Sequence, residues 1–253
     1  MAWIQASFFS DALGMCVNCN VILPVKADMG KPDRTRRPVL WLLHGAHGNC
    51  DDWLRSSNVE RYATRKGLAV VMPSVHLSSY MNMAHGGNYY DYITQELPAK
   101  MRQMFPLSDR PDRNFIAGLS MGGRGALMIG LANPEQYSAI GCFSAGLDIP
   151  AKAPYRDEVL GGKRPSGYGD IRQNVKTAAK SAHPPKIYHS CGTEDPFLSA
   201  ARKARDVIQA VPGDPFRYTY EEGPGAHEWD FWDNAVRTFI ERLPLKAAPQ
   251  VWR

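Results

Sequence analysis

Short apolar runs bounded by turn-forming residues recur along this chain of 253 residues. Such runs, when rich in β-branched and aromatic residues, are typical of strands buried in a parallel sheet. The pattern predicts five parallel core strands, at residues 39–44, 68–74, 114–120, 139–144 and 186–191. It also predicts an antiparallel strand at 17–23 and a late strand at 216–221.

Segments with helical spacing alternate with these strands, at residues 58–66, 89–105, 121–132, 199–211 and 229–243. Pro98 should kink or split the second helix, because proline lacks the backbone donor and its ring collides with the preceding turn. The alternation implies a mostly parallel central sheet with helices on both faces. We therefore predict the α/β class, with residues 1–253 in a single domain, as α/β folds of this length commonly are.

Residues 150–185 form the one irregular stretch. They are rich in Gly, Pro and Lys and carry only a weak helical pattern at 171–180. Insertions of this length are either functional loops or disordered segments, and this one follows a core strand. We interpret it as a partial lid over a pocket rather than as passive surface.

The charge balance is mildly basic. Lysine and arginine outnumber aspartate and glutamate by 30 to 25, which gives a net charge of +5. The basic residues are spread thinly except at Arg34, Arg36 and Arg37, which we interpret as a solvated surface turn. A nucleic-acid partner is therefore not expected. No apolar run approaches the roughly 20 residues that span a bilayer, so no membrane partner is expected either.

The five cysteines are an odd number, which disfavours a disulfide framework and favours a reducing compartment. Residues 1–15 lack the basic start and continuous apolar stretch of a secretory signal. We therefore predict a cytoplasmic protein. Cys16 and Cys19 form one Cys-x-x-Cys pair, but a structural zinc needs two further ligands, so we interpret the spacing as chance.

The segment Gly118-Leu119-Ser120-Met121-Gly122 fits the Gly-x-Ser-x-Gly pattern of a nucleophilic serine. The pattern alone is weak, but here it follows a predicted strand and precedes a predicted helix, which is the context it requires. A sharp turn there pushes the serine hydroxyl out of the sheet, and the glycines leave room where a Cβ would collide. Ser120 is therefore the candidate nucleophile.

A serine hydroxyl needs a histidine to take its proton and a carboxylate to orient that histidine. Asp195 follows the strand at 186–191, at the edge where parallel strands end, and is the candidate acid. Glu194 beside it and Asp148 after the preceding strand are the alternatives. His227 lies in a Gly-rich loop before the last helix and is the candidate base. We interpret the other six histidines as mainly structural.

The loop after the first core strand reads His44-Gly45-Ala46-His47-Gly48. We expect the backbone N–H groups of Ala46 and Met121 to form an oxyanion hole. Such donors stabilise the charge that develops on a carbonyl oxygen, and losing one typically costs about 100- to 1000-fold in rate. A metal site at His44 and His47 is the rival interpretation, disfavoured because a further ligand is not evident.

These motifs resemble the esterase D group of α/β-hydrolases, which includes S-formylglutathione hydrolases, tributyrin-type acetyl esterases and feruloyl esterases. The matching segments stand in order along most of the chain, at residues 42–49 with Trp53, 115–123, 191–195 and 226–229. The segment after Gly45 is most similar to the tributyrin esterase branch. The resemblance implies an α/β-hydrolase fold, a triad of Ser120, Asp195 and His227, and ester hydrolysis through an acyl-enzyme without a cofactor.

The loop at residues 80–92 carries aromatic and methionine side chains, which suit an apolar substrate group. We expect this loop to line the acyl or alcohol pocket, with a tryptophan near the oxyanion loop. The predicted substrate-binding residues are Trp53, Tyr80, Met83, His85 and Tyr89.

The sequence therefore predicts a serine carboxylesterase for short acyl esters, from acetyl to butyryl and including sugar-linked ones. A thioesterase of the S-formylglutathione hydrolase type and an acyltransferase use the same acyl-enzyme, so both stay open. A non-catalytic binding protein that retains the fold is disfavoured, because it would not need a full triad and an oxyanion loop. The expected partner is a small-molecule ester, and the sequence leaves the oligomeric state open, a homo-oligomer included.

Overall fold

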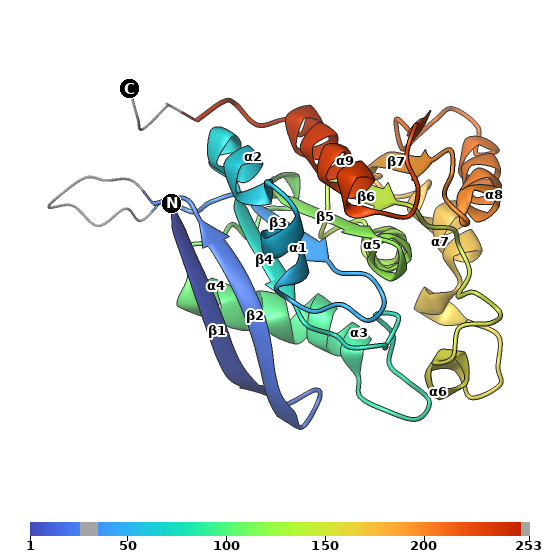
Figure 1. The fold of residues 1–253 in the computed structure, drawn as a ribbon, viewed down its shortest axis with the longest axis horizontal. Coiled ribbons are helices and arrows are strands. Elements are labelled where there is room, and N and C mark those ends of the chain that lie inside the picture. The colour runs from blue at the N-terminus through green and yellow to red at the C-terminus, as the bar shows by residue number, and fades with distance from the viewer. Residues whose placement is uncertain (26–34, 249–253) are drawn as a thin grey trace, which may run out of the picture.

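The computed structural model describes residues 1–25 and 35–248. Its strands are β1 Ala2–Ser10, β2 Met15–Leu23, β3 Val39–Leu43, β4 Ala69–Pro73, β5 Asn114–Leu119, β6 Ala139–Phe143, β7 Lys186–Gly192 and β8 Thr219–Gly223. They form one eight-stranded sheet in the order β1-β2-β4-β3-β5-β6-β7-β8 (Figure 1). The pairings from β4 through β8 are parallel, whereas β2 is antiparallel to both β1 and β4. The predicted α/β class and mostly parallel sheet are confirmed.

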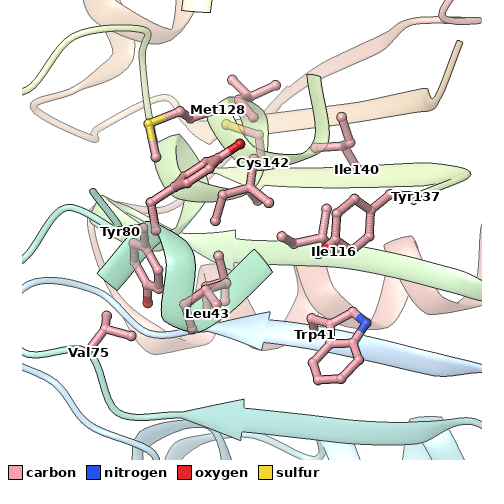
Figure 2. Packing of buried hydrophobic residues seen from close by; sticks show 14 of the residues in the cluster. Trp41, Leu43, Val75, Tyr80, Ile116, Met128, Tyr137, Ile140 and Cys142 are labelled. Carbon is pink, nitrogen blue, oxygen red and sulfur yellow. The ribbon is translucent and has the colours of Figure 1, made fainter. Parts of the chain in front are cut away.

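Helices cover both faces of this sheet (Figure 1). They are α1 Asp52–Ser56, α2 Val59–Lys66, α3 Tyr89–Asp91, α4 Leu97–Met104, α5 Met121–Ala132, α6 Arg156–Leu160, α7 Ile171–Ala178, α8 Leu198–Gln209 and α9 Trp229–Arg242, with short 3-10 turns at Pro111–Arg113 and Gly167–Gly169. Helices α1, α2 and α9 pack on one face, around Leu40 and Leu42. Helices α4, α5, α7 and α8 pack on the other, around Trp41, Ile116 and Met128 (Figure 2). Strands β3 to β6 are buried throughout, as strands covered on both faces must be.

Strand β1 was not predicted. It forms the edge of the sheet, and its side chains alternate between partly buried and exposed, with Trp3 57% exposed. Its aromatic residues favour a strand, but Trp3 and Phe9 stand on the exposed face, so the run lacks the alternation of apolar and polar residues that marks a half-buried strand. A distant residue holds the hairpin instead, because the Glu96 carboxylate accepts hydrogen bonds from the backbone N–H groups of Asp11 and Ala12.

The helix that contains Pro98 is distorted as expected. Between α3 and α4 the residues Tyr92–Glu96 form a π-helical turn, and Pro98 lies in the first turn of α4. A wider turn ahead of the proline accommodates the missing N–H without ending the helix. The late strand was predicted too early, because Arg217 adopts a left-handed backbone (φ 45°) before β8 begins.

The insertion at 150–185 contains α6, the 3-10 turn at Gly167–Gly169 and α7. Its later part packs on the core, where Tyr168 stacks on Tyr90 with ring centroids 3.7 Å apart and Ile171 is buried. Of the predicted basic turn, Arg36 pairs with Asp109, while Arg34 lies outside the described residues. None of the helices in the described parts of the chain is both long and apolar enough to cross a membrane.

Candidate active site

Ser120 occupies the sharp turn between β5 and α5. Its backbone lies at φ 52° and ψ −118°, a conformation that residues with a Cβ rarely adopt. A Cβ on Gly118 would lie 2.5 Å from the carbonyl oxygen of Gly122, and a Cβ on Gly122 would lie 2.5 Å from that of His44. Only glycine leaves space for these contacts, which is why the motif has glycines on both sides of the serine.

The turn brings Ser120 to two residues that are distant in sequence. His227 Nε2 lies 2.9 Å from Ser120 Oγ, and His227 Nδ1 lies 2.9 Å from Asp195 Oδ2. Asp195 follows β7 and His227 follows β8, so both side chains come from the carboxyl edge of the sheet, as Ser120 does. The three side chains therefore form one continuous hydrogen-bonded chain, and the geometry is that of a serine, its base and an orienting acid.

The Asp195 carboxylate is fully buried but well compensated. Burial raises its pKa, while hydrogen bonds from His227, from the Phe197 backbone N–H at 2.8 Å and from the Ser144 hydroxyl lower it by more. The net effect is a pKa below the ordinary value, so the carboxylate stays ionised at neutral pH. An ionised acid can fix the histidine tautomer and stabilise the imidazolium that forms when the serine is deprotonated.

Two aromatic rings hold the imidazole of His227. Phe197 lies on one side with ring centroids 4.9 Å apart, and Trp232 packs edge-on at 4.8 Å. Trp232 Nε1 also donates to Ser144 Oγ at 3.0 Å, and Ser144 is itself left-handed (φ 54°) at the end of β6. Sequence reasoning missed Ser144, Phe197 and Trp232, although each lies a few residues from a strand end or a triad position.

The predicted oxyanion donors border the same space. Met121 begins α5, so its N–H has no carbonyl in a preceding helical turn. Within the described residues no backbone or side-chain group accepts from Ala46 N–H. His44 fixes the direction of this N–H. Its Nδ1 bonds to the Gly45 carbonyl at 2.6 Å, and that carbonyl belongs to the same trans peptide group as the Ala46 N–H. Because the C=O and N–H of a trans peptide point in opposite directions, holding one also orients the other.

His44 is neutral. Val75 N–H donates to its Nε2, which places the proton on Nδ1, and burial lowers the pKa of this histidine to about 4. Both ring nitrogens are thus occupied by backbone groups, while His47 is exposed. The described residues contain no cluster of histidine, cysteine and carboxylate ligands suited to a metal ion.

The alternative acids lie elsewhere. Glu194 is exposed and has no side-chain hydrogen bond among the described residues. Asp148 accepts both bonds of a bidentate pair with Arg172, at 2.8 and 2.7 Å. Asp195 is therefore the carboxylate that the fold brings to His227.

A cavity of about 910 Å³ opens beside Ser120. Its lining includes the oxyanion loop with Ala46, the turn with Ser120 and Met121, and Trp229 and Trp232 of α9. The whole run from residue 144 to 156 forms another wall. The start of the predicted lid therefore does border the pocket.

The predicted substrate-binding residues do not line this cavity, and that prediction is corrected. Trp53 is 1% exposed, donates to the Leu43 carbonyl and packs behind Trp229. Tyr80 is fully buried in the core cluster, near Leu43 and Met128 (Figure 2), and its hydroxyl donates to the His44 carbonyl at 2.8 Å. These aromatic side chains support the walls of the site from behind.

The rest of the 80–92 loop turns toward the insertion. The backbone N–H of exposed His85 donates to the Glu158 carbonyl of α6, and Met83 packs against the core. Tyr89 is buried edge-on against His76. Aromatic and methionine content indicated a pocket, but the same residue types also fill cores, and here most of them do.

Comparisons with known proteins agree with this geometry. A family model described as putative esterase matches residues 10–243. The acetyl esterase of Caldicellulosiruptor saccharolyticus is 29% identical over an alignment of 262 positions, gaps included, that covers 95% of this chain and 97% of that protein.

Two solved structures from Staphylococcus aureus are similar over 96% of this chain and 98% of theirs, each at 31% identity. They are the fluorophosphonate-binding serine hydrolase FphF, with a TM-score of 0.87, and the S-formylglutathione hydrolase FrmB, with a TM-score of 0.82. The chain belongs to the esterase family, and it is a serine esterase with the α/β-hydrolase fold.

Proposed function

We propose that the protein hydrolyses short-chain carboxylic esters, with Ser120 as nucleophile, His227 as general base and Asp195 as the acid that orients the histidine. The observation that carries the proposal is the chain of hydrogen bonds from Ser120 Oγ through His227 to Asp195, with distances of 2.9 Å on both sides of the imidazole.

The chemistry follows from the placement of the donors. As Ser120 Oγ attacks the ester carbonyl, its proton moves to His227 Nε2, and Asp195 stabilises the resulting imidazolium. The negative charge on the carbonyl oxygen is met by the N–H groups of Ala46 and Met121, which no other group among the described residues uses. His227 then gives its proton to the leaving alcohol, and water resolves the acyl-enzyme by the same steps.

The preference for short acyl groups is supported by the likeness to an acetyl esterase. An apolar pocket discriminates one methylene by only about 1 to 3 kcal/mol, so we expect graded activity rather than a sharp cut-off. Acetyl and butyryl esters, sugar-linked ones included, are the proposed range.

The test is hydrolysis of 4-nitrophenyl acetate, butyrate and octanoate by wild type and Ser120→Ala. We expect turnover that falls with chain length and a loss on the order of 10⁶-fold in kcat in the variant. Glu194→Ala is the matched control and should keep most activity. Equal activity in wild type and Ser120→Ala, or none in wild type, would contradict the proposal.

A thioester substrate is the second candidate, favoured by the likeness to FrmB, which carries the name S-formylglutathione hydrolase. The acyl-enzyme is the same, so only kinetics separates the two. A kcat/KM for S-formylglutathione far above that for 4-nitrophenyl acetate would assign the thioesterase activity.

We also propose a cytoplasmic location. Its support is that all five cysteines are free thiols, and four of them are buried. Cell fractionation with an antibody against the protein would test the location.

A further inference from the structure

The cavity beside Ser120 carries an excess of positive charge. It is lined by more cationic side chains than carboxylates. The cationic ones are Arg124, Lys152, Arg156, Arg172 and Lys203, and the carboxylates are Asp52 and Asp148. The bidentate pair of Arg172 with Asp148 is neutral as a unit, so four cations face a single remaining carboxylate.

Arg124 is the buried member of this group. It follows Ser120 by one turn of α5, is 3% exposed and forms no ion pair among the described residues. Its Nε donates to the Leu147 carbonyl at 3.1 Å, while its terminal nitrogens contact the sulfur atoms of Met81 and Met128 and a carbonyl 3.5 Å away. Thioethers are weak acceptors, so the guanidinium is poorly compensated.

The charge of Arg124 persists at neutral pH. Burial lowers its pKa to about 10, which still leaves the group protonated. Asp148 attracts Arg124 without bonding to it and is already paired with Arg172. A buried cation without a directly bonded counter-ion is costly, and its field is less screened by water than that of a surface charge. A substrate anion in the cavity would reduce that cost.

Three further cations line the same cavity. Lys152 and Arg156 come from the 144–156 wall and Lys203 comes from α8. Lys152 and Lys203 are exposed, and none of the three forms an ion pair within the described residues. Asp52 belongs to the oxyanion side, where its carboxylate accepts from the Asn49 N–H.

We propose that this cavity selects esters that carry a carboxylate, on the acyl or on the alcohol part. A cleft lined by charge of one sign raises the local concentration of the opposite charge, and arginine binds carboxylates with directed donors. This inference rests on the proposed function, because the bound ester must be cleaved at Ser120.

Two matched pairs of substrates test the two possible positions of the carboxylate, on the acyl part and on the alcohol part. On the acyl side, 4-nitrophenyl hydrogen glutarate is compared with 4-nitrophenyl pentanoate, which has the same leaving group and chain length. On the alcohol side, 3-acetoxyphenylacetate is compared with 3-acetoxyphenylacetamide. Rates with Ser120→Ala give the non-enzymatic background, which matters because the glutarate carboxylate can attack its own ester.

We expect kcat/KM for the charged member of at least one pair to be about 5- to 20-fold higher at low ionic strength. That ratio should fall as salt is added, because screening weakens the attraction. The substrate pair that shows this preference for the charged ester identifies whether the acyl or the alcohol part carries the carboxylate.

Charge-reversal variants test whether the lining cations cause the preference for charged esters. Lys152→Glu/Lys203→Glu should lower the charged-to-neutral ratio at least fivefold, and both residues are exposed, so folding is preserved. Lys176→Glu/Lys180→Glu makes the same change of net charge on exposed residues outside the lining and should keep the ratio.

Two results would overturn the inference while leaving the proposed function intact. One is cleavage of neutral and charged esters at equal kcat/KM, dependent on Ser120. The other is an equal drop of the ratio in both double variants, which would assign the effect to net charge alone. Failure to cleave any ester would overturn both proposals.

Discussion

Two walls of the cavity are held in different ways. The nucleophile wall, residues 45–47 and 119–121, is fixed by backbone packing: the missing Cβ of Gly122 would lie 2.5 and 2.6 Å from two carbonyl oxygens. The insertion wall, residues 144–156, is held by side-chain hydrogen bonds. Arg124 of α5 donates to the Leu147 carbonyl, Arg172 of α7 donates to Asp148, and Arg156 of the wall itself donates to the Ile149 carbonyl.

The difference separates the residues that carry out the reaction from those that select the substrate. On the nucleophile wall the reacting groups depend on backbone atoms that have no room to move, so the chemistry tolerates little change. On the insertion wall a few exchangeable side chains set shape and charge, so substitutions there should change substrate preference more than turnover. The predictions below test this contrast.

The largest effect is expected from Gly122→Ala, directly behind the nucleophile wall. The new Cβ meets backbone atoms of Leu43 and His44, which cannot give way, so the oxyanion loop or the Ser120 turn must shift. We expect kcat to fall about 100- to 1000-fold, as when an oxyanion donor is lost. Steady-state kinetics with 4-nitrophenyl acetate measures it.

Gly223→Ala is the matched control, since nothing lies within 4 Å of a Cβ there and the backbone is unstrained. It should keep wild-type kcat. Full activity of a folded Gly122→Ala variant would remove the distinction between the two walls.

The second prediction concerns two buried histidines, one behind each wall. His44 bonds to the Gly45 carbonyl and His189 Nε2 to the Ala145 carbonyl at 3.0 Å, and burial lowers the pKa of each to about 4. In the unfolded chain these two histidines have pKa values near 6.5. As pH falls, they therefore become protonated in the unfolded chain before they do so in the folded protein. Stability is therefore complete above about pH 6.5 and falls by about 3 kcal/mol per histidine toward pH 4.

Urea denaturation at a series of pH values measures this slope. His189→Gln keeps an amide donor for the Ala145 carbonyl without titrating, so its stability should decline less steeply between pH 6.5 and 4. His183→Gln, at an exposed position, should leave the slope unchanged. Identical slopes in all three proteins would refute the assignment.

The third prediction is a smaller loss where the insertion wall meets the triad. Ser144→Ala removes the hydroxyl that bonds to Asp195 and accepts from Trp232. We expect kcat to fall about tenfold, because one charge-assisted hydrogen bond contributes about 1.5 kcal/mol or more.

Ser138→Ala removes a hydroxyl that bonds only to the Asn114 carbonyl in the described structure and serves as control. An unchanged kcat in Ser144→Ala, or an equal fall in Ser138→Ala, would contradict a specific role of the Ser144 hydroxyl in supporting the acid.

The smallest effect is expected on the insertion wall itself. Arg172→Gln breaks the bidentate pair with Asp148, and exposed pairs of this kind contribute about 0 to 1 kcal/mol. We expect KM to rise two- to threefold with kcat unchanged, as the wall loosens. Arg202→Gln breaks an equally short pair with Glu222 outside the cavity and should change neither constant. A loss of kcat in Arg172→Gln would place the insertion wall in the chemistry.

Much of this molecule could be predicted from short-range pattern. The core strands at β3 to β7, the helix α5 and the order of Ser120, Asp195 and His227 follow from apolar runs and motif spacing, because each depends on neighbouring residues. The prediction missed strand β1, because this strand is stabilised by pairing with β2 and by Glu96, which lies 85 residues away from Asp11 along the chain. The pocket prediction failed because residue type does not reveal which side of a wall a tyrosine or tryptophan occupies.

The sequence by itself determined the fold class, the strained serine turn and a candidate triad in which Glu194 and Asp148 stayed open as alternatives to Asp195, since a glycine motif and an apolar period specify local geometry. Only the tertiary structure decided which carboxylate meets His227, how Ser144 and Trp232 hold that pair, and which side chains face the cavity. The physical reason is that hydrogen bonds and burial are set by distances between segments, and strand ends more than 70 residues apart along the chain converge on one edge of the sheet.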